Sequence, residues 1–178
     1  CGYRTFPTHR LLRNNSKKRG RIMSEPKILE LEKKLNKMHD IIAVGFSADF
    51  SITSSNWQQK SLIFDKTIKK IGNDLTLESG KVKIGAGVKV VKVSFQGLVN
   101  ALANDTFYDI QIRKNTTYIT SCSGRKTGDP QSWSFWISPV VIEVTEGDII
   151  EMSAFVTSAT FVANNATQFL VEIIEYED

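Results

Sequence analysis

The chain between residues 64 and 176 consists of short apolar segments in which both faces of the expected strands carry apolar side chains. The last segment, residues 168–176, divides its apolar residues between two faces: Phe169, Val171 and Ile173 on one, Leu170, Ile174 and Tyr176 on the other. A two-sheet sandwich needs only one apolar face per strand, so the second face calls for a partner. The pattern predicts a small β domain that self-associates.

From residue 44 onward the chain is punctuated by Gly, Asn, Asp and Ser, and no helical period lasts ten residues. Many short strands at near-regular spacing predict a sandwich or jelly roll. The expected strands are Phe46–Ile52, Lys60–Phe64, Thr67–Ile71, Leu75–Leu77, Lys81–Ile84, Val88–Val99, Phe107–Lys114, Thr116–Cys122, Ser132–Ile137, Val140–Val144, Asp148–Val156 and Gln168–Tyr176.

One short helix is expected before these strands. Ser24 can cap it, and Pro26 falls in the first turn, where its missing N–H is harmless. Its apolar residues follow coiled-coil spacing: Ile28, Leu31, Leu35, Met38 and Ile42. About two heptads are too few to associate alone. The helix is therefore either a short oligomeric stalk joined by the β domain, which is our expectation, or an amphipathic helix folded back on that domain.

The charge of the chain is divided unevenly. The net charge is +4, but residues 1–22 hold seven Lys and Arg and no acid, which leaves 16 basic and 19 acidic residues beyond them. A mildly acidic body argues against a nucleic-acid partner, and no apolar stretch is long enough for membrane insertion. Residues 1–22 are either translated sequence upstream of Met23 or a basic docking arm. We expect three segments: the leader 1–22, the helix 23–43 and the β domain 44–178.

Three segments of the β domain carry a resemblance to a known superfamily. Residues 80–94 (GKVKIGAGVKVVKVS) are similar to a glycine-flanked strand pair, residues 140–151 (VVIEVTEGDIIE) to a Gly-Asp turn after an alternating strand, and residues 169–174 (FLVEII) to a final core strand. Together they resemble the tumour-necrosis-factor-like jelly rolls, which include the complement globular heads. With a short coiled coil and no signal peptide, the layout looks most like phage-encoded fibre heads. The resemblance implies a homotrimer displayed on a virion.

The search for chemistry finds no catalytic residues, no metal ligands and no cofactor motif. With Cys122 as the one cysteine outside the leader, zinc spacing is not available, and Asp105, Asp109 and Asp129 are ordinary turn residues. Ser123–Thr127 is expected to be an exposed polar loop. The remaining candidates are aromatic. A glycan platform is predicted to use Trp133, Trp136, Tyr118 and Arg125, although Trp133 and Trp136 are expected first of all in the core and the subunit interface.

The sequence thus predicts a non-enzymatic structural protein. We expect a mainly β, homotrimeric jelly roll with a short N-terminal coiled coil, serving as a phage head fibre or capsid decoration protein able to adhere to host-surface glycans. Its expected contacts are its own copies and capsid or other virion proteins, the latter through the N-terminal region, and its expected location is the virion, assembled in the host cytoplasm. The oligomerisation residues are the five heptad residues with Leu170, Ile174 and Tyr176. The alternatives are a tail receptor-binding tip and a bacterial surface or spore adhesion module.

Overall fold

The computed structural model describes residues 26–29, 40–53, 58–100, 107–126, 132–156, 158–163 and 166–177. Apart from a helical turn at residues 26–29, the regular structure within these ranges is β. The strands are β1 (Ile41–Gly45), β2 (Phe50–Thr53), β3 (Lys60–Ser61), β4 (Lys66–Ile71), β5 (Leu75–Glu78), β6 (Lys81–Ile84), β7 (Val88–Asn100), β8 (Phe107–Lys114), β9 (Thr117–Arg125), β10 (Ser132–Glu143), β11 (Ile149–Val156), β12 (Ser158–Phe161) and β13 (Gln168–Tyr176).

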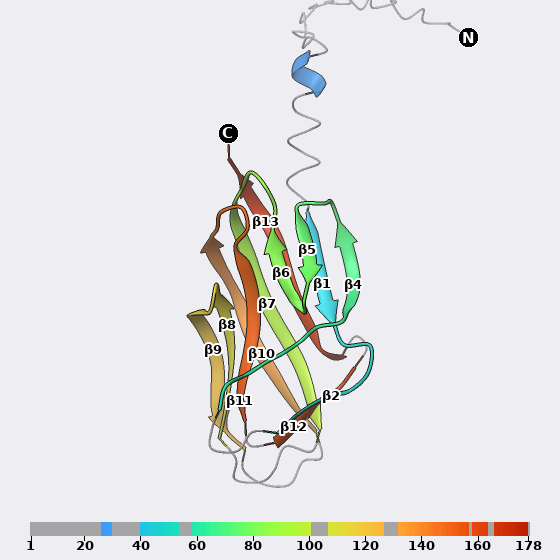
Figure 1. Ribbon diagram of the computed structural model, residues 1–178, viewed down its shortest axis with the longest axis vertical. Helices are drawn as coiled ribbons and strands as arrows, with labels where there is room; N and C mark the ends of the chain where they lie inside the picture. The colour runs from blue at the N-terminus through green and yellow to red at the C-terminus, as the bar shows by residue number, and fades with distance from the viewer. Residues whose placement is uncertain are drawn as a thin grey trace, which may run out of the picture.

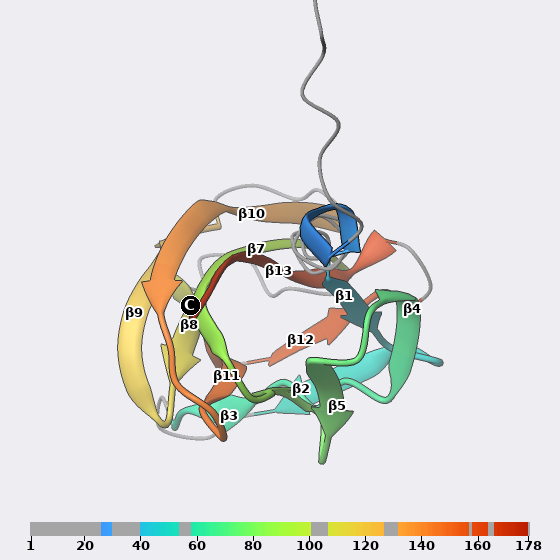
Figure 2. The same ribbon diagram turned by 90° about the horizontal axis from the view of Figure 1, so that it is seen from above.

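The strands form two curled sheets, and within each sheet neighbouring strands pair antiparallel. One sheet, called the β7 sheet here, has the order β2-β12-β7-β13-β1-β4, with β10 on the other edge of β7. The second, the β11 sheet, has the order β5-β6-β11-β8-β9, with β3 also paired to β11. Seen from above, the two sheets enclose the core between them (Figure 2). The C-terminus lies at one end of the domain, and β2 and β12 lie at the other (Figure 1).

Alternation along the strands fills this core. In β13, Phe169, Val171 and Ile173 are fully buried, as the period of two predicts. Five phenylalanines are among the largest fully buried side chains: Phe46, Phe64, Phe95, Phe161 and Phe169. Cys122 is a free thiol that packs partly buried against the same core, as a small apolar side chain does. The predicted mainly β jelly-roll architecture is confirmed.

The prediction that a helix reaches Ile42 is wrong. Ile42 lies in β1, between Val171 of β13 and Lys70 of β4, and its side chain is completely buried. Two flanking strands satisfy the backbone of β1 and the core takes up its apolar side, whereas two heptads of helix are marginal by themselves. Ile28, in the helical turn, is exposed, and Leu31, Leu35 and Met38 lie outside the described residues. The first strand therefore begins before residue 44.

Other strand boundaries also differ from the expectation. Residues 46–49 turn before β2, β3 is only two residues long, and β10 runs through Pro139 with a register shift between Ile137 and Val140. β12 was not predicted, because its Ser-Ala-Thr-Phe stretch lacks a clear alternation. It pairs with β2 and with the end of β7, so long-range pairing creates it.

Candidate functional site

The outer face of the β7 sheet, which points away from the core, carries exposed apolar side chains in register. One row runs across five strands from Val141 of β10 through Lys92, Glu172 and Ile41 to Ile71 of β4. A second row joins Ser94, Leu170 and Ala43, and a third joins Trp136 to Gln96 and Gln168. Because neighbouring strands lie about 4.8 Å apart, each row forms a continuous strip of side chains.

Several of these side chains are open to solvent. Trp136 is 72% exposed and Val141 is 60% exposed, while Ile71 and Ile174 are also exposed. Leu170 and Ile41 are half-buried. Lys92 and Glu172 form an ion pair in the middle of the face, so covering the face would leave neither of these charges unpaired. A face on which exposed apolar side chains surround an ion pair is suited to contact with another protein surface.

The sequence predicted that Tyr176 shares this face with Leu170 and Ile174, and the structure places it elsewhere. Register shifts on either side of Glu175 turn the end of β13, and Tyr176 packs against the core instead. Its hydroxyl donates a hydrogen bond to Asp74 Oδ2 (3.1 Å). Burial, together with the carboxylates of Asp40 and Asp74, raises the pKa of Tyr176, which keeps the hydroxyl protonated as a donor.

The structure separates the residues of the predicted glycan platform. Trp133 packs against the core with Phe135 and Ile137, while Trp136 faces outward on the β7 sheet, as the alternation predicted. Tyr118 and Arg125 both belong to β9 of the other sheet. They are seven residues apart, which places their Cα atoms about 23 Å apart along the strand. These four residues therefore do not make one site.

Two other expectations concern polar residues. Ser123–Arg125, expected in a loop, continue β9 and pair with Phe107–Asp109 of β8, and Lys126 is buried. Asp109 lies in β8 rather than in a turn, while Asp105 and Asp129 fall outside the described residues. Within the described part of the chain, no group of three or more His, Cys, Asp or Glu side chains is placed to hold a metal ion. No helix among the described residues is long and apolar enough to cross a membrane.

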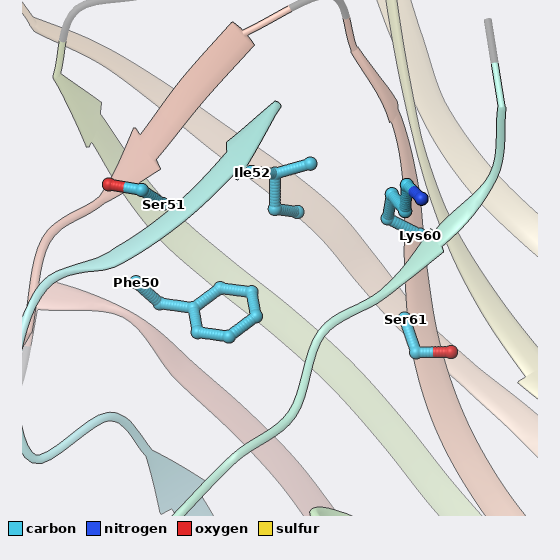
Figure 3. A pocket seen from close by; sticks show the side chains of 5 residues that line it. All are labelled: Phe50, Ser51, Ile52, Lys60 and Ser61. Carbon is cyan, nitrogen blue, oxygen red and sulfur yellow. The ribbon is translucent and has the colours of Figure 1, made fainter. Parts of the chain in front are cut away.

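A small cavity opens at the end of the domain opposite the C-terminus. It has a volume of about 190 Å³ and is lined by Phe50, Ser51 and Ile52 of β2 and by Lys60 and Ser61 of β3. Figure 3 shows Phe50 and Ile52 between the two strands, with Ser51 pointing away. Ser51 instead shares a hydrogen bond with Thr160 of β12 (3.0 Å between the hydroxyl oxygens). The cavity lies between β2 of one sheet and β3 of the other, and among the described residues that line it Lys60 is the charged one.

The solved structures that resemble this chain share its architecture. Murine APRIL at pH 8.0 superposes with a TM-score of 0.58 at 12% sequence identity, over 76% of this chain and 98% of that one. Eiger TNF from S. frugiperda superposes with a TM-score of 0.59 at 9% identity, over 79% of this chain and 94% of that one. The chain has a tumour-necrosis-factor-like jelly-roll fold. At these identities the likeness establishes the fold alone.

Comparison by sequence adds nothing to this. No family model matches the chain, and no curated protein matches it. The tumour-necrosis-factor-like jelly roll that the motifs predicted is therefore confirmed by three-dimensional likeness and not by sequence similarity. The strand pair β6–β7, the Gly147-Asp148 turn and the final strand β13 all lie within this fold.

Proposed function

We propose that the chain is a non-enzymatic structural protein that assembles as a homotrimer through the outer face of the β7 sheet. The observation that carries the proposal is the set of exposed apolar side chains on that face, above all Trp136, Val141 and Ile71. Burying a large apolar side chain is worth about 1.5–3 kcal/mol. A few such side chains from each copy supply the drive for association, and the resemblance to trimeric jelly rolls supports three copies.

The experiment is light scattering of the full chain with one charge placed on the proposed interface. Val141→Asp buries a carboxylate between subunits if the face is covered, which costs several kcal/mol. We expect a trimer in the parent and a folded monomer in this variant at micromolar concentration. Tyr118→Asp, on exposed β9 of the β11 sheet, is the matched control and leaves the trimer intact. A monomeric parent, or a trimer that tolerates Val141→Asp, contradicts the proposal.

We further propose that this trimer belongs to a bacterial virus, as a head fibre or capsid decoration protein docked through its N-terminal region. The support is the resemblance of the layout, a short heptad segment followed by one jelly roll, to phage-encoded fibre heads. Immunogold electron microscopy of purified particles tests it. Label on the capsid is the expected result. Label at the tail tip would identify a receptor-binding protein, and label only on bacterial cells or spores would identify a cellular adhesion module.

Adhesion to host-surface glycans is the binding activity we assign to such a particle. Tyr118, which is exposed on β9 of the sheet that this trimer leaves uncovered, offers a ring face on which a sugar can stack. Weak single sites become effective through three copies per trimer and many trimers per particle, which raises the apparent affinity by about 10²–10⁴. A glycan array probed with the trimeric protein tests this activity, and the absence of any bound glycan contradicts it.

A further inference from the structure

The outer face of the β11 sheet buries polar side chains at positions where a two-layer sandwich normally has hydrated ones. Their neighbours along β11, Ile150, Met152 and Ala154, point into the core, so Glu151 and Ser153 point outward. Nevertheless Ser153 is only 1% exposed and Glu151 only 6% exposed, and Gln111 beside them on β8 is 9% exposed. Other side chains cover them, and those side chains are polar as well.

The covering groups form one connected hydrogen-bond network. Gln111 Nε2 donates to Asp109 Oδ2 (2.6 Å), and Arg113 Nη1 donates to Gln111 Oε1 (3.1 Å). Arg113 Nη1 also donates to Gln59 Oε1 (3.0 Å), and Gln59 Nε2 donates to Ser153 Oγ (2.9 Å). Gln59, which lies outside both strands, therefore connects Asp109, Gln111 and Arg113 of β8 to Ser153 of β11 through hydrogen bonds. We call Gln59, Asp109, Gln111, Arg113 and Ser153 the outer polar network.

Two atoms of this network lack a hydrogen-bond partner. Within the part of the chain that the structure describes, Asp109 Oδ1 and Arg113 Nε are both closed to solvent and unpaired. An unmade hydrogen bond on a buried group costs about 1–3 kcal/mol, and more when the group is charged. One of the two atoms is an acceptor and the other a donor, and Gln111 bridges their side chains. The network is therefore incomplete at both ends.

The charges around the network select the class of molecule that would complete it. The positive charge of Arg113 is balanced by the negative charge of Asp109, and Lys81 forms an ion pair with Glu151 (2.5 Å between Nζ and Oε2). An anion would meet two carboxylates and a cation would meet two basic groups, so neither gains from this surface. A hydroxyl both donates and accepts, and can satisfy the Asp109 oxygen or the Arg113 N–H. Half-buried Phe155, opposite Asp109, and exposed Tyr118, opposite Arg113, offer ring faces at the two ends.

We propose that the outer polar network is a binding site for a neutral saccharide and that Gln59 covers it when no sugar is bound. Gln59 precedes the short strand β3, which lies beside β11 in Figure 2 and pairs with it at Ser61 with Ser153 and Lys60 with Ala154. The next residue, Leu62, donates its N–H to the Met152 carbonyl (3.0 Å), so the chain is anchored after β3 and Gln59 lies before the paired residues. Displacement of the segment that carries Gln59 breaks the two Gln59 hydrogen bonds and opens Asp109, Gln111 and Arg113 to a ligand. The inference rests on the adhesive part of the proposed function and is independent of the trimer.

The test begins with an array of neutral and acidic bacterial oligosaccharides, probed with the full chain. The strongest neutral binder is then titrated calorimetrically against three variants. Arg113→Lys keeps the positive charge but removes the Nε–H donor. Asp109→Asn keeps the shape of the side chain but replaces one acceptor oxygen with an NH₂ donor. Each is expected to raise Kd at least tenfold. Lys70→Gln, at an exposed position of β4 in the other sheet, is the matched control and leaves Kd within twofold. Thermal melting identifies any variant that fails to fold, and Asp109→Asn is the milder of the two changes.

The outcomes separate this inference from the adhesion proposal. Saccharide binding that both network variants leave unchanged retains adhesion but overturns the site proposed here. Binding confined to acidic glycans also overturns it, because the network is electrically balanced. A parent that binds no glycan overturns both, and the two unpaired atoms are then hydrated. Hydrogen exchange supplies a reading independent of mutation: the bound neutral saccharide should change the protection of residues 58–61, and unchanged protection contradicts the cover.

Discussion

The carboxylate of Asp40 occupies the space in which a side chain on Gly72 would lie. A Cβ built on Gly72 would stand 1.8 Å from the Asp40 carboxyl carbon. The same carboxylate accepts hydrogen bonds from the backbone N–H groups of Asn73 (3.1 Å) and Asp74 (3.3 Å). Asp40 thus holds the β4–β5 turn against the chain directly before β1, and Gly72 is the position that makes this contact sterically possible.

Gly72→Ala is therefore expected to destabilise the protein more than a comparable change elsewhere. Gly72 and Gly147 both have positive φ (77° and 84°), so alanine is strained at either position by about 1 kcal/mol. Only Gly72 also has a close neighbour, whereas a Cβ on Gly147 would meet nothing within 4 Å. Urea unfolding should show a loss of about 3 kcal/mol or more for Gly72→Ala. Equal losses in the two variants would mean that the Asp40 contact contributes nothing.

Asp148 should contribute stability that disappears in acid. Partial burial acts to raise its pKa, but hydrogen bonds from Asn115 Nδ2 (2.6 Å) and the Thr145 N–H (3.0 Å), with the Lys114 ammonium, hold the pKa below its ordinary value of 3.8. A pKa lowered by folding means that the unfolded chain binds the proton more tightly. The contribution is therefore present above the unfolded pKa and is lost as the pH falls through the folded pKa.

Asp148→Asn should then cost about 1–2 kcal/mol near neutral pH and clearly less near pH 3. Urea unfolding of parent and variant at both pH values measures the difference. Asp65 is the control, because hydrogen bonds from Ser47 also lower its pKa although it sits at the surface, so Asp65→Asn should have a smaller effect. A cost for Asp148→Asn that does not change with pH would show that its ionisation is not linked to folding.

Phe64→Ala should be among the most damaging core substitutions. Phe64 is fully buried and stacks on Phe46 (ring centroids 4.9 Å apart) and on Phe169 (5.5 Å). Removing it leaves a cavity and takes one stacking partner from each of these two rings, so we expect a loss of about 3–5 kcal/mol. Phe50→Ala is the comparison, since Phe50 is half-buried and stacks only on Phe46 among the described rings (4.8 Å). A loss as large for Phe50 as for Phe64 would contradict the assigned burial.

Thr116→Gly should stabilise the protein. Asn115 and Thr116 form the two-residue turn between β8 and β9, and both have positive φ (47° and 70°). A β-branched residue is strained in that region, and Asn-Gly is the favoured pair in such a turn. The expected gain is up to about 1 kcal/mol in thermal or urea unfolding. Thr117→Gly, one residue later in β9, is the control and should destabilise. A loss of stability in Thr116→Gly would contradict this prediction and show that the exposed threonine side chain stabilises the turn.

The sequence by itself determined most of the strands and the fold class. Alternation has a period of two and is a local property, so the buried faces of β11 and β13 could be predicted from neighbouring residues. The Gly147-Asp148 turn could be predicted too, because Gly supplies the positive φ and the Asp148 carboxylate binds a backbone N–H three residues earlier. The same alternation placed Trp136 on the face opposite Phe135.

The tertiary structure decided what depends on residues far apart in the chain. Ile42 fits a heptad as well as a strand, and only pairing with Val171 and Lys70 makes it part of β1. The last turn of β13 moves Tyr176 off its expected face to reach Asp74, 102 residues away in sequence. The outer polar network joins Arg113 to Gln59 across 54 residues. Periodicity reports the local backbone, whereas such contacts follow from the way two sheets close around one core, which no local pattern records.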